Sequence, residues 1–153
     1  MSSLDDLYRQ VILDHSRERH GSGLVGGASA QSHQINPTCG DELTLDLHVD
    51  AVTRVVHVRW EGSGCAISMA SASLLTDLVA GTDIDGLPPR IQAFRAMLRS
   101  RGEDQGDDEL LGDAVVLSGV SRYIARVKCA MLAWVALEDA LTRVDNQVTD
   151  SHS

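Results

Sequence analysis

Residues 41–69 read DELTLDLHVDAVTRVVHVRWEGSGCAISM, and the clearest secondary-structure pattern of the chain lies in this segment. Apolar and polar residues alternate over 42–49 and again over 52–60, which predicts two strands that each bury one face. The short Asp50-Ala51 turn between them favours an antiparallel pair. The glycine-rich run that follows, Gly62-Ser63-Gly64, ends the second strand and leads to a cysteine.

Helical patterns lie on both sides of this pair of strands. Apolar residues recur at helical spacing over 3–19, over 68–80, after Pro88-Pro89 and over 123–141. Cys65-Ala66-Ile67 is either a short third strand or the run into the second of these helices. The remaining segments are a glycine-rich mobile loop over 21–30, a polar connection over 101–108 and an apolar element of open type over 110–117.

These elements predict an α+β fold, with a small antiparallel sheet of about three strands packed with helices. The chain has 153 residues, which suits one domain at about 150 residues per domain. We expect that domain to span 1–144. The polar segment 145–153 is expected to be a disordered tail.

Charge excludes two classes of partner. The chain carries 13 Lys and Arg against 22 Asp and Glu, a net charge of −9. Nucleic acids and anionic membrane surfaces both attract basic proteins, so neither is expected as a partner. The sequence has no apolar run of the ~20 residues that a membrane helix needs, and its beginning lacks the features of a signal peptide. A cytoplasmic location is therefore expected.

Three cysteines carry the chemical signal of the sequence. Cys39, Cys65 and Cys129 are an odd number, so they cannot all pair within the chain. Glycine flanks the first two, and Asp41 follows Cys39 closely. Thiolates and carboxylates are both zinc ligands, so these four residues are candidates for one metal site. The alternative is that each cysteine is a small buried apolar residue, since no C-x-x-C pair is present.

Simpler roles are expected for the other polar residues. Arg126 and Lys128 lie beside Cys129 at the start of a helix, which predicts a stabilised thiolate there. The acidic run 103–109 is expected to be a solvated loop, with docking to a basic partner as the alternative. Serines near Cys65 are expected to pack and cap, not to act as nucleophiles. Histidines divide into those that could join a site (His15, His20, His33) and those expected to face solvent (His48, His57).

Three motifs together resemble those of a known family. Residues 37–41 (PTCGD), 62–68 (GSGCAIS) and 127–134 (VKCAMLAW) are similar to the cysteine motifs of the IscU/NifU-like iron–sulfur cluster assembly proteins. The resemblance covers roughly residues 3–143.

Two features point to the SufU branch of that family. The segment between Pro88 and the third cysteine is long, and Lys128 stands where IscU proteins usually have histidine. The Leu-Pro-Pro-Val-Lys chaperone-binding signature is also missing.

The resemblance implies a site, a cofactor and a partner. It implies a zinc ion held by Cys39, Asp41, Cys65 and Cys129. It implies that Cys39 accepts persulfide sulfur from a PLP-dependent cysteine desulfurase of the SufS type, with Arg126 near the site, and that Suf scaffold proteins lie downstream. Whether the chain is then an enzyme or an acceptor acting with its partner stays open. Two other functions also stay open: a scaffold for a [2Fe–2S] cluster on the same ligands, and a structural zinc module that only binds a partner.

Overall fold

One antiparallel sheet and a set of helices make up the structure. The computed structural model describes the backbone of residues 3–151 and the side chains of residues 5–144. Within that range four strands pair in the order β1-β2-β3-β4. The strands are β1 (Ala30–Asn36), β2 (Asp41–Val49), β3 (Val55–Ser63) and β4 (Thr82–Asp83). The helices are α1 (Ser3–Glu18), α2 (Ala66–Val79), the 3-10 turn η1 (Ile84–Gly86), α3 (Leu87–Arg99), α4 (Asp108–Leu111), the 3-10 segment η2 (Gly112–Arg122) and α5 (Ile124–Ser151).

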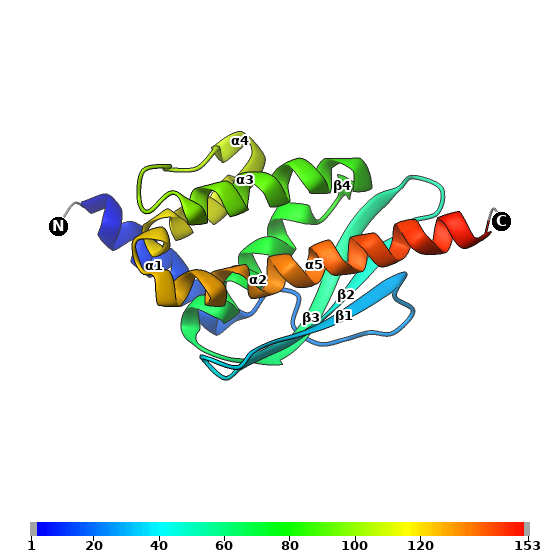
Figure 1. Cartoon of the computed structure of the whole chain (residues 1–153), viewed down its shortest axis with the longest axis horizontal. Coiled ribbons are helices and arrows are strands. Elements are labelled where there is room, and N and C mark those ends of the chain that lie inside the picture. The colour runs from blue at the N-terminus through cyan, green and yellow to red at the C-terminus, as the bar shows by residue number, and fades with distance from the viewer. Residues whose placement is uncertain (1–2, 152–153) are drawn as a thin grey trace.

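Helices α2 and α5 cover the apolar face of the sheet. Figure 1 shows α5 running across the sheet, with α3 on the side of the helical layer away from the strands. The alternating apolar residues of β2 and β3 point into this layer, and Trp60 is fully buried among them. On the helical side, Phe94 of α3 stacks on Trp134 of α5 with ring centroids 3.9 Å apart. The predicted α+β fold is confirmed.

Strand predictions were correct in type and incomplete in number. The pair predicted over 42–49 and 52–60 is β2 and β3, paired antiparallel with Leu45 opposite Trp60. The second strand begins later than predicted, because the Asp50 carboxylate accepts from the backbone N–H groups of Val52 and Thr53 and closes a turn there. Cys65-Ala66-Ile67 is not a strand. Strands β1 and β4 were not predicted.

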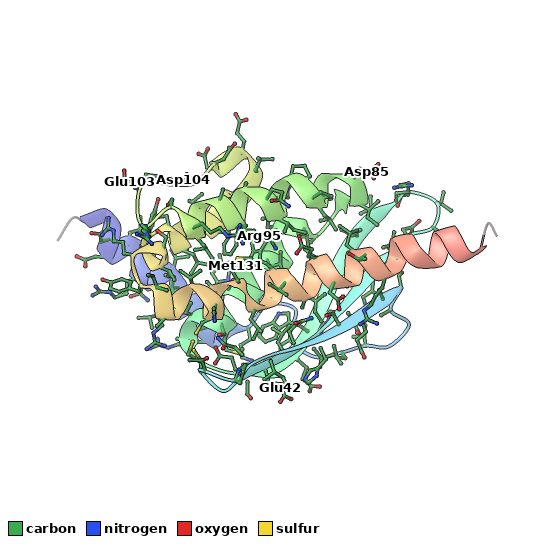
Figure 2. The ribbon with its side chains drawn as sticks, viewed as in Figure 1. Glu42, Asp85, Arg95, Glu103, Asp104 and Met131 are labelled. Carbon is green, nitrogen blue, oxygen red and sulfur yellow. The ribbon has the colours of Figure 1, made fainter. Side chains whose placement is uncertain are left out.

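The predicted helices match the observed helices except near the helix ends. The predicted helices over 3–19 and 68–80 correspond to α1 and α2. The apolar element of open type is α4 followed by the 3-10 segment η2. The acidic run 103–109 is exposed apart from Gly106, but it is a loop only to Asp107, because Asp107 caps α4 and Asp108 and Glu109 form its first turn. Glu103 and Asp104 point outward from that run (Figure 2). The tail differs from prediction, since the backbone of 145–151 continues α5; residues 152–153 lie outside the described range.

The helical layer is joined by polar contacts as well as apolar ones. Arg95 of α3 donates to both carboxylate oxygens of Glu138 on α5, at 3.0 and 2.7 Å, and Figure 2 shows it between the two helices. Ser71 of α2 donates to the carbonyl of Ala130 on α5. Among the described residues, no helix combines the length and the apolar character that crossing a membrane requires.

Candidate metal centre

Three separate parts of the chain bring the cysteines to one end of the sheet. Cys39 lies in the turn between β1 and β2, and Asp41 is the first residue of β2. Cys65 is the N-cap residue of α2. Cys129 lies in the second turn of α5. Each residue therefore sits at the beginning of a rigid element or in a tight turn, where side chains converge without interrupting backbone pairing.

Three of the four predicted ligands meet, and the fourth lies beside them. The Sγ atoms of Cys39 and Cys129 are 3.1 Å apart, and both cysteines are free thiols. One donor atom from each of Cys39, Asp41 and Cys129 lies within 4.8 Å of the others. Cys65 lies beside this group, with its Sγ 3.8 Å from Oδ2 of Asp41. Three thiols and one carboxylate match the four donors of a tetrahedral zinc site in number and kind.

Burial differs sharply across the cluster. Asp41 and Cys129 are buried, Cys65 is partly buried and Cys39 is exposed. Cys39 also follows a proline and a threonine and precedes Gly40, whose φ of +73° lies in the left-handed region that glycine adopts easily. The exposed thiol is thus the one on the turn, while its three neighbours are held by β2, α2 and α5.

The carboxylate of Asp41 is fixed from two sides. Its Oδ1 accepts from the backbone N–H of Cys65 at 3.0 Å. Its Oδ2 accepts from the hydroxyl of Ser68 at 2.5 Å. Burial raises the pKa of Asp41, but these hydrogen bonds, with one from Cys129, outweigh it and hold the pKa below its usual range. Asp41 is therefore an oriented, negatively charged group.

Glycines make room for this arrangement. A Cβ at Gly64 would lie 2.5 Å from Oδ1 of Asp41. A Cβ at Gly62 would lie 2.3 Å from the backbone oxygen of Glu42. No side chain fits at either position without displacing its neighbour. The Gly-Ser-Gly run, which the sequence predicts to end a strand, thus also lies where β3 approaches the start of β2 closely.

The prediction of a stabilised thiolate at Cys129 is wrong. Burial, followed by hydrogen bonds with Cys39 and Asp41, raises the pKa of Cys129 far above its ordinary value. Arg126 and Lys128 are exposed; within the part of the chain that the structure describes, Arg126 makes no side-chain hydrogen bond or ion pair. Cys65 behaves differently. Burial raises its pKa, but hydrogen bonds with Ser68 outweigh burial and lower it.

A residue that sequence reasoning missed supports the site. Ser68 is buried and lies three positions after the N-cap Cys65, where a side chain can reach back over the first turn of a helix. That spacing is the available signal, although the sequence predicts only packing and capping for Ser68. Ser71 does have the expected packing role: its hydroxyl also accepts from Nε1 of Trp134 at 3.0 Å and thereby fixes α2 against α5.

The histidines lie elsewhere. His33 pairs with Glu42 on the sheet, at 3.4 Å between Nε2 and Oε1. His57 faces solvent as expected, but His48 is partly buried and its Nε2 is enclosed without a hydrogen-bond partner among the described residues. His15 and His20 lie together between α1 and α2, their ring centroids 4.9 Å apart. None of them joins the cysteine cluster.

A cleft of about 570 Å³ opens beside the cluster. It lies between α1, the start of α2 and η2. Ile67, two residues after Cys65, lines it, as do Tyr8 and Tyr123. Tyr123 and Ile124, just before Cys129, are 64% and 71% exposed. Apolar side chains are therefore exposed near the N-terminal ends of α2 and α5, the helices associated with Cys65 and Cys129.

Comparisons with known proteins agree on one family. A family model described as the NifU-like N-terminal domain matches residues 7–130. The chain is 40% identical to the zinc-dependent sulfurtransferase SufU of Bacillus subtilis, over 93% of this chain and 94% of that protein. It is 36% identical to the iron–sulfur cluster assembly scaffold protein IscU of Streptococcus pyogenes, over 95% and 89%. The crystal structure of the N-terminal part of a NifU-like protein from Brucella abortus superposes with a TM-score of 0.81 at 25% identity, over 95% and 99%.

Proposed function

The chain belongs to the family of the NifU-like N-terminal domain, and from this membership we propose that it is a zinc-dependent sulfur acceptor in iron–sulfur cluster assembly. Its partner is a PLP-dependent cysteine desulfurase of the SufS type, and Cys39 is the residue that receives the sulfur. One observation carries the proposal: an exposed thiol on a turn lies 3.1 Å from a buried thiol, within a cluster of three cysteines and one aspartate. The name of the Bacillus subtilis relative supports both the metal and the reaction class.

The donor set fits zinc on chemical grounds. Cys39, Asp41, Cys65 and Cys129 are the residues that would hold the ion. Burial and the Asp41 carboxylate oppose ionisation of Cys129 when no cation is near, and a divalent cation relieves that opposition. Bound zinc supplies one thing to the chemistry, which is that it keeps coordinating thiols deprotonated at neutral pH.

The sulfur transfer is a displacement at sulfur. The Cys39 thiolate attacks the terminal sulfur of the partner's cysteine persulfide, in the manner of thiol–disulfide exchange. A new S–S bond forms at Cys39, and the S–S bond of the partner persulfide breaks. The partner cysteine leaves as a thiolate, and the terminal sulfur keeps its proton. No external oxidant or reductant is needed, since the sulfane sulfur keeps its oxidation state.

Residues of this chain prepare that step in different ways. The turn containing Gly40 presents Cys39 to solvent, where a docked partner reaches it. Asp41 stays in place because Ser68 and the Cys65 N–H hold both of its oxygens. Arg126 is exposed one helical turn before Cys129, and we assign it to stabilise the leaving thiolate of the partner cysteine. The exposed Tyr123 and Ile124 provide apolar surface for the partner.

A scaffold for a [2Fe–2S] cluster is the second candidate function. It is favoured by the 36% identity to a protein named as an IscU scaffold. Cysteine thiolates are the usual ligands of such clusters, so the donor set does not separate the two functions. A purely structural zinc module is disfavoured, because closed structural sites do not need an exposed ligand on a glycine turn.

The test is stimulation of the desulfurase. Alanine release from cysteine is measured anaerobically with a SufS-type desulfurase, alone and with the zinc-loaded chain. We expect the wild-type chain to raise the rate and Cys39→Ala to leave it at the rate of the desulfurase alone. Thr38→Ala, an exposed neighbour in the same turn, is the matched control and should stimulate like the wild type. Stimulation by Cys39→Ala at the wild-type level would contradict the proposal.

A further inference from the structure

A second group of metal-binding side chains lies between α1 and α2. His15 comes from α1, His20 from the turn that follows it, and Asp77 from α2. One donor atom from each of the three lies within 4.8 Å of the others. Two imidazoles and one carboxylate are a donor set that divalent first-row transition metals bind, with positions left for water. No part of the proposed sulfur transfer uses these residues.

The outer partners of this group orient both rings as ligands. Nδ1 of His15 is 2.7 Å from Oγ of Ser73, and that hydroxyl oxygen accepts from the backbone N–H of His20 at 2.9 Å. Nε2 of His20 is 2.9 Å from a carboxylate oxygen of Glu18. A ligating histidine is normally held in this way, with one ring nitrogen on a protein acceptor and the other directed at the metal.

The other ring nitrogen of His20 faces the third member of the group. Nδ1 of His20 lies 2.6 Å from Oδ2 of Asp77, and the two histidine rings meet edge to face at 4.9 Å between centroids. With no metal, His20 must carry a proton on each nitrogen to bond both Asp77 and Glu18. A cation replaces the proton that lies between His20 and Asp77, while the Nε2 proton stays on the Glu18 side.

This group is separate from the cysteine cluster. Cys65 caps α2, and Ser73 and Asp77 lie 8 and 12 residues further along that helix. At 1.5 Å per residue those positions are roughly 12 and 18 Å along the helix axis from Cys65. The donors also differ in kind, since the second group has nitrogen and oxygen and no sulfur. One metal ion cannot use both groups.

We propose that His15, His20 and Asp77 bind a second divalent transition-metal ion, with Glu18 and Ser73 as outer partners. The ion joins the end of α1 and the following turn to the middle of α2. It is a structural clamp remote from Cys39. The side chains of His20 and Asp77 are 36% and 52% exposed, so the ion enters directly from solvent.

Zinc titration of the full chain tests this site. The metal-stripped chain is dialysed against Zn²⁺ under reducing conditions, and the bound metal is counted. We expect two equivalents for the wild type and one for both His20→Gln and Asp77→Asn. His33→Gln removes an exposed histidine of the sheet and should still bind two. Binding of a single equivalent by the wild type, or of two by His20→Gln and Asp77→Asn, would overturn the proposal. The contacts of His20 with Asp77 and Glu18 would then be ion pairs without a metal.

Cobalt distinguishes the two sites by their ligands. Co²⁺ on the cysteine cluster gives an intense thiolate-to-metal absorption band, whereas Co²⁺ on nitrogen and oxygen ligands does not. We expect two bound cobalt ions per wild-type chain and only one thiolate-ligated ion. His20→Gln should lose one ion without any loss of the thiolate band. Loss of the thiolate band in His20→Gln would show that the histidines belong to the cysteine site, against the proposal.

Discussion

The carboxylate of Asp41 is held in a fixed orientation within the candidate metal site. It starts β2, its side chain is buried, and both of its carboxylate oxygens already accept a hydrogen bond. A carboxylate held in this way presents its remaining lone pairs in a fixed direction. The residues that hold it are therefore expected to matter for metal binding even though they are not ligands.

Ser68→Ala tests that expectation. The variant removes the hydroxyl that donates to Oδ2 of Asp41 at 2.5 Å. Loss of an outer partner typically costs 10–100-fold in metal affinity, and we expect a loss of about that size for zinc, measured by competition with a chromogenic chelator. Ser68→Thr keeps a hydroxyl and should recover most of the affinity. Ser118→Ala, at a buried serine outside the cluster, serves as the control. Unchanged affinity in Ser68→Ala would remove Ser68 from the site.

Gly64→Ala tests the close approach at the same carboxylate. The new Cβ would lie 2.5 Å from Oδ1 of Asp41, so either the carboxylate or the start of α2 must move. We expect zinc affinity to fall at least about tenfold, as for other disturbances of ligand orientation. The control is Gly119→Ala, where no atom lies within 4 Å of the added Cβ. Equal zinc affinity in the two variants would mean that the site tolerates displacement of Asp41.

Among the secondary-structure elements, the sequence predicts those whose apolar residues repeat with a regular period. Strands β2 and β3 alternate cleanly, and the apolar stripes of the longer helices are regular. Strand β1 was missed because its inward positions are Ala30, Ser32 and Asn36, which are small or polar. Ser32 is buried because its hydroxyl donates to Asp139 of α5, a contact between residues 107 positions apart. Local sequence carries no signal of such a long-range contact.

His48 of β2 makes folding stability depend on pH. Its ring stacks on that of His57, with centroids 4.6 Å apart and planes within 2° of parallel. Burial, followed by the charge of His57, lowers the pKa of His48 below its usual value of 6.5. Between the two pKa values the unfolded chain binds more protons than the folded one. The His48 contribution to the free energy of unfolding therefore falls as pH falls from about 6.5 toward the folded pKa.

Urea unfolding between pH 7.5 and 5 measures this dependence. His48→Phe keeps an aromatic ring in the stack and removes the titrating group. We expect the free energy of unfolding to fall less steeply toward acid pH in His48→Phe than in the wild type. The comparison isolates His48, since every other titrating group is common to both proteins. Parallel curves would mean that His48 protonates equally in the folded and unfolded states.

At the scale of the whole molecule, the cluster joins segments far apart in the chain. Cys39 and Cys129 are 90 positions apart, and Cys65 begins a third element between them. The cysteines and Asp41 could be predicted as one site because their motifs resemble a known family. The ionisation of Cys129 could not be predicted, because it depends on the complete burial of this α5 residue, which the exposed charges beside it in sequence do not reveal.

Because the ligands come from three elements, metal binding should stabilise the whole fold. A ligand at 1,000 times its Kd contributes about 4 kcal/mol to stability, and 1 kcal/mol shifts the Tm of a protein this size by about 2–4 °C. We expect chelation of zinc to lower the Tm by on the order of 10 °C. The experiment uses His20→Gln, which lacks the second proposed site. In the double variant His20→Gln, Cys129→Ser, the chelator should leave the Tm unchanged. A Tm that chelation leaves unchanged would argue against metal at the cysteines.

The most direct test locates the transferred sulfur. The zinc-loaded chain is mixed anaerobically with a SufS-type desulfurase and cysteine, free thiols are trapped, and the digested protein is analysed by mass spectrometry. We expect one added sulfur atom on the peptide that carries Cys39, and none on the peptides that carry Cys65 or Cys129. A persulfide on either of those cysteines, or none on the chain while the desulfurase turns over, would contradict sulfur transfer to Cys39.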